Sequence, residues 1–286
     1  MAEVTAADVK KLREKTGAGM MECKNALVSC GGDFAAAEKR LKEKGLAAVE
    51  KRAGRATNEG KIFITIRGAK AVLLELATET DFVARNPEFI ALGGTIAEKA
   101  LDAGYTKPVK ELSALVTGLA TKIRENMSLK RLVVMDAAAG EYMTKYLHGD
   151  GNIGVLVKLG ADKDGAFENE EVKAFAFGLA LHIAAFNPMA ISRDNIDPAW
   201  LKEQEEIFRG QMEQDESVKS KPPAVVENIL KGKINKLLKE ICLLDQGYVK
   251  DEKLSVSQAL ADISRKTGAA ITVKDYLYYK VGSEDA

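Results

Sequence analysis

Histidine and cysteine are scarce in this sequence, and their scarcity excludes several common kinds of active site. The 286 residues include two histidines and three cysteines, and no two cysteines form a CxxC pair. The HExxH, GxSxG and GxxxxGK(S/T) motifs of zinc peptidases, serine hydrolases and P-loop nucleotide-binding proteins are absent too. We therefore expect a protein that works by binding, with no catalytic residue, cofactor or metal site. An enzyme built on carboxylates alone is a disfavoured alternative.

An excess of one charge and a long apolar run are also missing. Lys plus Arg and Asp plus Glu each total 42, so no overall positive charge attracts nucleic acid. The longest apolar run, AFAFGLALHIAAF at residues 174–186, is too short to span a bilayer. The first residues, MAEVTAADVKKLREK, lack the apolar core of a signal peptide, and the cysteines are typical of reduced thiols. These features predict a cytoplasmic protein with neither a nucleic-acid nor a membrane partner.

Residues 1–54 are expected to form a small domain of three helices. Thr5 and Asp8 have the spacing of a capping box at the start of the first helix. Asp33 is typical of the N-cap of the third helix, and Gly45 is expected to end that helix. A domain of this size buries little area and is marginal alone, so a docking role is expected.

The rest of the chain contains an internal repeat. The segment AVLLEL, which begins at residue 71, aligns with GVLVKL, which begins at residue 154. Each segment is the second strand of a predicted hairpin, and each hairpin is followed by a loop and an apolar helix. A hairpin with a helix on one face is an α+β unit. The sequence therefore predicts an α+β core of two parts, residues 55–140 and 141–286.

Two long helices are expected to interrupt the second part, at about residues 195–245. Asp197-Pro198 is typical of a helix start, and Pro222-Pro223 breaks the helical pattern. The second helix carries an apolar stripe with coiled-coil-like spacing: Val226, Leu230, Ile234, Leu237, Ile241 and Leu244. We expect an antiparallel helical hairpin that projects from the core, followed by a C-terminal module at about residues 250–286.

The segment ELATETDFVARNPEF places an aromatic residue between a strand and a helix. Asn86 and Pro87 are typical of the N-cap and first residue of the helix, so Asp81 and Phe82 are expected on a connecting loop. Two interpretations of Phe82 remain open at this point. Its ring either packs against the helix that begins at Pro87 or is aimed at another molecule.

Two long motifs carry a family resemblance, LREKTGAGMMECKNAL at residues 12–27 and ELATETDFVARN at residues 75–86. They resemble the N-terminal and core signatures of the elongation factor Ts family. The segments LHGDGNIGVLV, NPMAISRDNI and EICLLDQGYVKD are similar to that family in character and order. The family commonly has Asn and Cys where this chain has Ala77 and Thr78, and Gly where it has Asp150. These departures leave residues 80–83 intact.

The resemblance implies a guanine-nucleotide exchange factor for elongation factor Tu. Such a factor is not an enzyme. Such a factor binds the GDP-bound and nucleotide-free GTPase, displaces magnesium and promotes GDP release. The resemblance also implies that the N-terminal helices form a ubiquitin-associated-like domain. It assigns Thr80, Asp81, Phe82 and Val83 to partner binding and magnesium dislocation, with Phe82 as a wedge between partner helices.

Secondary partner contacts are expected from His148, Arg13 and Lys24. The pair Met20-Met21 is expected in the core of the N-terminal helices, and His182 is expected to be a hydrogen-bonded core histidine. Both a one-to-one and a two-to-two complex fit the sequence, because coiled-coil-like hairpins can mediate dimers. The alternative function is a ubiquitin-associated-type adaptor without exchange activity, which would leave residues 80–83 unexplained.

Overall fold

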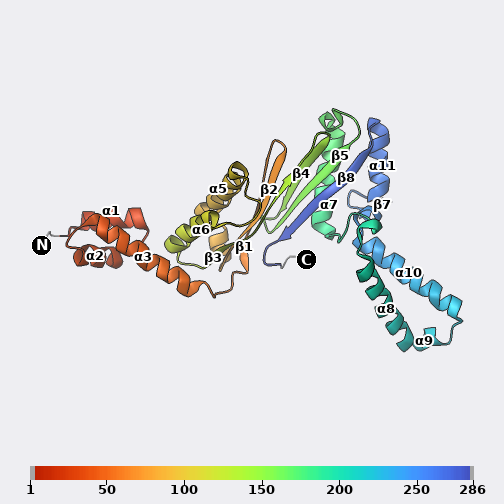
Figure 1. Cartoon of the computed structure of the whole chain (residues 1–286), viewed down its shortest axis with the longest axis horizontal. Helices are drawn as coiled ribbons and strands as arrows, with labels where there is room; N and C mark the ends of the chain where they lie inside the picture. The colour runs from red at the N-terminus through yellow and green to blue at the C-terminus, as the bar shows by residue number, and fades with distance from the viewer. Residues whose placement is uncertain (1–3, 284–286) are drawn as a thin grey trace. The chain divides into compact units, whose positions relative to one another are not determined.

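The computed structural model describes residues 4–283 and has an α+β fold (Figure 1). The chain divides into two units. The first unit comprises the residues up to Asp136, the turn at Leu147–Gly154 and the end of the chain from Tyr279. The second comprises Ala137–Tyr146 and Val155–Tyr278. Within the described part of the chain, every helix is too short or too polar to cross a bilayer.

Three helices begin the first unit: α1 (Ala6–Thr16), α2 (Met20–Ser29) and α3 (Phe34–Arg52). The expected caps are confirmed, since Thr5 and Asp8 form a capping box and the Asp33 carboxylate accepts hydrogen bonds at the start of α3. The expectation that Gly45 ends α3 is wrong. A Cβ atom at Gly45 would lie 2.2 Å from Thr121 Cγ2, so this glycine permits close approach to another helix.

The first sheet has the strand order β1-β2-β3 and is antiparallel. It contains β1 (Glu59–Arg67), β2 (Lys70–Thr78) and β3 (Met127–Asp136). Helices α5 (Pro87–Ala103) and α6 (Lys110–Ile123) pack on it (Figure 1). The central strand β2 is buried along almost its whole length because it has a neighbour on each side and a helical layer on one face.

A buried carboxylate lies on the first sheet and is paired. Glu75 on β2 is fully buried, and its carboxylate accepts hydrogen bonds from Arg131 Nε at 2.8 Å and from the Gly282 N–H at 3.0 Å. The Arg131 guanidinium lies 3.9 Å from the ring centroid of Tyr279. An unpaired buried charge would cost several kcal/mol, and the bond from Gly282 that helps to satisfy Glu75 also holds the backbone at this glycine against the sheet.

The second sheet has the order β4-β5-β8, with β4 (Glu141–His148), β5 (Ile153–Ala161) and β8 (Ile271–Lys280). Figure 1 shows α7 (Glu170–Phe186) and α11 (Val256–Thr267) beside it. Both sheets consist of a hairpin with a third strand next to the second strand of that hairpin. The two predicted hairpins and the helix after each are therefore confirmed. The shorter elements of this unit are η1 (Ala166–Glu168), η2 (Arg193–Asn195), η3 (Leu243–Asp245), β6 (Gly247–Tyr248) and β7 (Asp251–Ser255).

The helical insertion consists of α8 (Pro198–Gln214), the short α9 (Glu216–Lys219) and α10 (Pro223–Ile241). Asp197 caps α8 as expected. Within α10 the predicted apolar stripe is wrong at one position, because Leu238 is buried in place of Leu237. With the partly buried Val226 and Ile241, the packed positions Leu230, Ile234 and Leu238 form one apolar stripe along α10. Leu244 lies beyond α10, in η3.

Two adjacent glycines in α5 differ in what surrounds them. A Cβ atom at Gly93 would lie 2.2 Å from Phe63 Cζ, whereas a Cβ atom at Gly94 would have no neighbour within 4 Å. Gly93 is fully enclosed where the helix meets β1, and the Phe63 ring also packs on Phe89 with the ring centroids 6.4 Å apart. The close approach of α5 to the first sheet therefore depends on the missing side chain at Gly93.

The two alanine substitutions should act in opposite directions. Gly93→Ala should lower the free energy of unfolding by about 1–3 kcal/mol, because the added methyl group displaces the Phe63 ring. Gly94→Ala should raise it by about 0.5–1 kcal/mol, because alanine favours the helix and meets open space. Urea unfolding of both variants checks this, and equal effects of the two would contradict the packing described.

Candidate functional site

The residues between β2 and α5 form one helical turn, α4 (Asp81–Ala84). The expectation of a connecting loop at Asp81 and Phe82 is therefore wrong. Thr80 caps the turn, since its hydroxyl accepts a hydrogen bond from the Val83 N–H at 3.4 Å. The Ala84 N–H donates to the Thr80 carbonyl at 3.2 Å, which closes the helical ring.

Neighbouring residues of α4 have opposite environments. Val83 is 8% exposed and Ala84 is also buried, and both belong to the core beneath the first sheet's helices. Phe82 is 83% exposed. Its ring therefore does not pack against the helix that begins at Pro87, which removes one of the two interpretations of this residue. Leaving a phenyl ring in water forgoes about 1.5–3 kcal/mol of burial energy, so folding alone gives no reason for its position.

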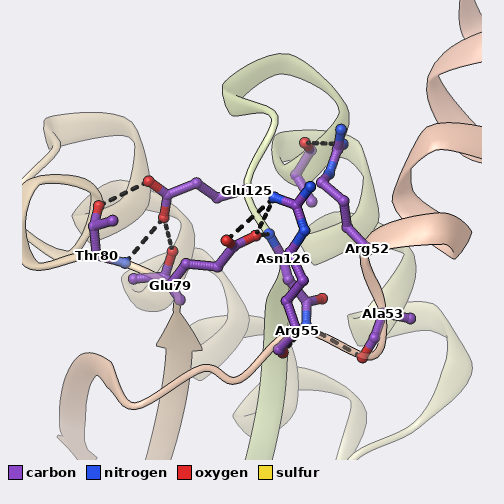
Figure 2. A network of polar contacts seen from close by, with 9 residues as sticks. Arg52, Ala53, Arg55, Glu79, Thr80, Glu125 and Asn126 are labelled. Atoms are coloured by element: carbon purple, nitrogen blue, oxygen red, sulfur yellow. Dashed lines mark hydrogen bonds and ion pairs between the residues drawn. The ribbon is translucent and has the colours of Figure 1, made fainter.

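The Glu125 carboxylate holds the start of α4 (Figure 2). It accepts hydrogen bonds from the Thr80 hydroxyl at 2.7 Å and from the Thr80 N–H at 3.1 Å. It also accepts one from the Thr78 hydroxyl at 2.9 Å, which satisfies this buried residue at a position where the sequence departs from the family pattern. Sequence reasoning did not identify Glu125, because its partners lie more than forty residues away along the chain.

Asn126, the next residue, binds the linker, which is the segment between α3 and β1. Its side-chain Nδ2 donates to the Ala53 carbonyl at 3.3 Å and to the Arg55 carbonyl at 2.7 Å. Its backbone N–H donates to the Glu79 carboxylate at 2.6 Å. The Arg55 guanidinium pairs with the same carboxylate at 3.3 Å (Figure 2). Linker and turn are thus joined through one set of polar contacts.

The carboxylate of Asp81 is paired on the surface. The Arg85 guanidinium lies 3.5 Å from Asp81 Oδ2 and 3.8 Å from Asp150 Oδ2. Asp150, another departure from the family pattern, therefore adds an ion-pair partner beside α4. Such exposed pairs contribute at most about 1 kcal/mol each.

His148 lies at the end of β4, at the turn that carries Asp150. The turn is fixed by a hydrogen bond from the Ile62 N–H to the Gly151 carbonyl at 2.8 Å and by a bond from Lys61 to the Asp150 carbonyl. The His148 side chain is exposed. The ion pair between Arg85 and Asp150 joins this turn to the end of α4.

Arg13 and Lys24 are exposed on α1 and α2. The expectation that Met20 and Met21 lie in the core is wrong, because they are 54% and 64% exposed. The core face of α2 is formed by other residues, Cys23, Ala26 and Leu27. Helical spacing places Met20, Lys24 and Val28 along one outer face of this helix, which is apolar apart from one cation.

Ion pairing around Glu22 connects α2 to the end of α6. Lys44 and Arg124 both pair with its carboxylate, and the Gly19 N–H donates to it at 3.1 Å. The hydrogen bond from Lys44, then those from Gly19 and Arg124, lower the pKa of Glu22 to about 2.

In the range 4–283, no group of three or more His, Cys, Asp or Glu side chains could hold a metal ion.

His182 is the core histidine that the sequence predicts. It is fully buried on α7, its Nε2 lies 2.9 Å from Gln246 Oε1, and its Nδ1 accepts a hydrogen bond from the Val249 N–H at 3.2 Å. An Nδ1 that accepts cannot carry a proton, so the ring is neutral with the proton on Nε2. Burial lowers the pKa of His182 below its usual 6.5, against an opposing effect of Gln246.

Acid should destabilise the second unit through His182. Below about pH 6.5 the unfolded chain binds a proton that the folded state rejects, so the free energy of unfolding should fall by at most about 1.4 kcal/mol per pH unit. Thermal melts of the wild type and of His182→Gln at pH 7.5 and 5.5 check this. The variant should lose less stability on acidification, and an unchanged pH dependence would contradict the assignment.

Comparison with known proteins places the chain in a family. The family model described as "Elongation factor TS" matches residues 79–283. Elongation factor Ts of Treponema denticola is 49% identical over 280 residues, covering 98% of this chain and 99% of that protein. Those of Treponema pallidum and Borrelia recurrentis are 45% and 40% identical, with the same coverage. The chain therefore belongs to the elongation factor Ts family.

Proposed function

We propose that this translation elongation factor is the guanine-nucleotide exchange factor for elongation factor Tu and that it acts by inserting the Asp81–Phe82 turn into the GTPase. The observation that carries the proposal is the exposure of Phe82, 83%, on a turn whose next two residues are buried. Membership of the family supports the partner. In this proposal the factor acts in the cytoplasm and is not an enzyme. It needs no cofactor and binds neither nucleic acid nor a membrane.

Exchange requires no acid or base. A GTPase holds GDP through backbone amides, a lysine and a magnesium ion, and release is slow because these contacts break together. Such an exchange factor binds the nucleotide-free GTPase better than the GDP-bound form. It therefore lowers the affinity of the GTPase for GDP by the same factor by which GDP lowers the affinity of the GTPase for the exchange factor. A thousandfold faster release needs about 4 kcal/mol of barrier reduction, which is within reach of one buried aromatic anchor and a displaced metal.

Phe82 meets the physical requirements of such an anchor. Its ring is rigid, and burying it in a partner recovers about 1.5–3 kcal/mol that the free chain forgoes. Because Thr80 and Val83 already fix the turn, little conformational entropy is lost on insertion. Asp81 sets the angle by accepting hydrogen bonds from a partner helix N-terminus after exchanging its contact with Arg85.

Other contacts extend the interface. His148, on the turn whose Asp150 pairs with Arg85 at the end of α4, is a second contact with the GTPase in this proposal. The N-terminal helices form a ubiquitin-associated-like domain that docks on a second face of the partner, with Arg13 and Lys24 as charged contacts. The apolar outer face of α2, with Met20 and Met21, supports this docking role. Both a one-to-one and a two-to-two complex fit this proposal.

An adaptor that binds client proteins without exchange activity is the second candidate. The exposed face of α2 favours it as much as it favours docking on a GTPase. It gives no account of the exposed Phe82. A pull-down that recovers clients but no GTPase, together with unchanged GDP release, would establish the adaptor and reject exchange.

Phe82→Ala should reduce the acceleration of GDP release by at least about thirtyfold, the equivalent of a hot-spot loss of about 2 kcal/mol. The measurement is stopped-flow release of a fluorescent GDP from elongation factor Tu, with substoichiometric factor and excess unlabelled GDP. Circular dichroism of the variant should match the wild type, because the ring contributes little to the fold.

Ile207→Ala is the matched control, since Ile207 is another large, exposed apolar residue and lies on α8 in the second unit. It should exchange at the wild-type rate. Wild-type protein that leaves GDP release unchanged would reject the exchange function. A Phe82→Ala variant that is fully active, or one that unfolds, would reject the role of the ring.

A further inference from the structure

The helical turn that carries Phe82 is too short to fix its own direction. Isolated helices shorter than about 12–15 residues are marginal in water, and α4 has four residues. Its orientation must therefore come from contacts with the rest of the unit. Val83 and Ala84 provide a buried apolar anchor on one side. The start of the turn has a polar anchor, and Glu125 supplies it.

Three consecutive residues, 124–126, contact three different parts of the first unit. Arg124 ends α6 and pairs with Glu22 on α2. The Glu125 carboxylate accepts hydrogen bonds from the N–H and the hydroxyl of Thr80. Asn126 binds the carbonyls of the linker that follows α3. A single short segment thus connects the N-terminal helices, their linker and the turn that carries Phe82.

We infer that Glu125 and Asn126 are positioning residues for Phe82, and that they tie the direction of its ring to the linker of the N-terminal helices. The inference rests on the proposed function, in which Phe82 enters the GTPase. Glu125 acts on the turn directly, through charge-assisted hydrogen bonds to Thr80. Asn126 acts through the linker and through Glu79, the residue before Thr80.

Two hydrogen bonds from Asn126 and one ion pair with Glu79 hold the linker. Asn126 is buried, so loss of its side chain would leave the Ala53 and Arg55 carbonyls without their donor. Glu79 receives one hydrogen bond from Asn126 and an ion pair from Arg55. Figure 2 shows these groups converging between the linker and the end of β2. A partner that moves the linker therefore acts on the backbone next to the turn.

Removal of the Glu125 carboxylate should affect the maximal rate more than binding. Glu125→Ala should lower GDP release at saturating factor about tenfold, equivalent to about 1.4 kcal/mol, because the ring is no longer held in its productive direction. The concentration of factor that gives half the maximal rate should stay within about twofold, because the docking surfaces are unchanged. Asn126→Ala should produce the same pattern.

Glu125→Gln is the conservative control. The amide oxygen can still accept from the Thr80 N–H and the Thr78 hydroxyl, and the amide nitrogen can donate to the Thr80 hydroxyl. This variant should keep most of the maximal rate. A loss as large as that of the alanine variant would overturn the positioning role, because the geometry is preserved and only the charge is removed.

A double-mutant cycle separates positioning from general stability. If Glu125 acts through Phe82, Glu125→Ala should have no further effect in a Phe82→Ala background. Independent, multiplicative effects of the two substitutions would overturn the inference. The same holds for Asn126→Ala in that background.

A measurement without the GTPase distinguishes failure of the inference from failure of the proposed function. The chain has a single tryptophan, Trp200, so Phe82→Trp combined with Trp200→Phe creates one reporter on α4. Time-resolved fluorescence anisotropy should show faster local motion of this reporter after Glu125→Ala. Unchanged motion would overturn the positioning role even where Phe82 is needed for exchange. Suppose that the reporter moves faster after Glu125→Ala but that the wild-type factor does not accelerate GDP release from elongation factor Tu. That result would reject the proposed function and keep the structural role of Glu125.

Discussion

The hydrogen bonds from Thr80 to the Glu125 carboxylate determine what the first unit presents to solvent. They fix the N-cap of a helix that is only one turn long, and that turn then buries Val83 and Ala84 while it leaves Phe82 exposed. Without this anchor the short helix has too few hydrogen bonds of its own to persist. The exposed ring is therefore a product of well-satisfied local contacts, and strain plays no part in it.

An exposed but fixed aromatic ring suits a protein that works by binding. The first sheet and its two helices provide a rigid core, in which Glu75 is neutralised by Arg131 and β2 is enclosed on both sides. Among the large apolar side chains of residues 4–283, Phe82 in the turn at its edge is the most exposed, at 83%. Binding energy gained there can be spent on weakening another molecule's hold on its ligand, because the ring itself needs little rearrangement. Because positive and negative residues are equal in number, no overall charge selects the partner, and we expect local contacts such as this one to do so.

Local sequence signals predicted much of the fold. The caps at Thr5 and Asp33, the two hairpins and the helix starts at Pro87 and Pro198 all follow from residue types that act on their immediate neighbours. Gly45, Leu237 and the Met20-Met21 pair were assigned wrongly because tertiary packing decides them. Glu125 could not be found from sequence, since its role depends on contacts with Thr78 and Thr80 far along the chain. The expected partner came from the family resemblance, whereas the exposure of Phe82 is visible only in the structure.

The structure of this chain bound to nucleotide-free elongation factor Tu would test the central claim most directly. The account predicts that the Phe82 ring is buried among residues of the GTPase, close to where magnesium and diphosphate bind, with Thr80 still hydrogen-bonded to Glu125. A ring that remains in solvent in that complex, or that folds back onto this chain's own α5, would contradict it.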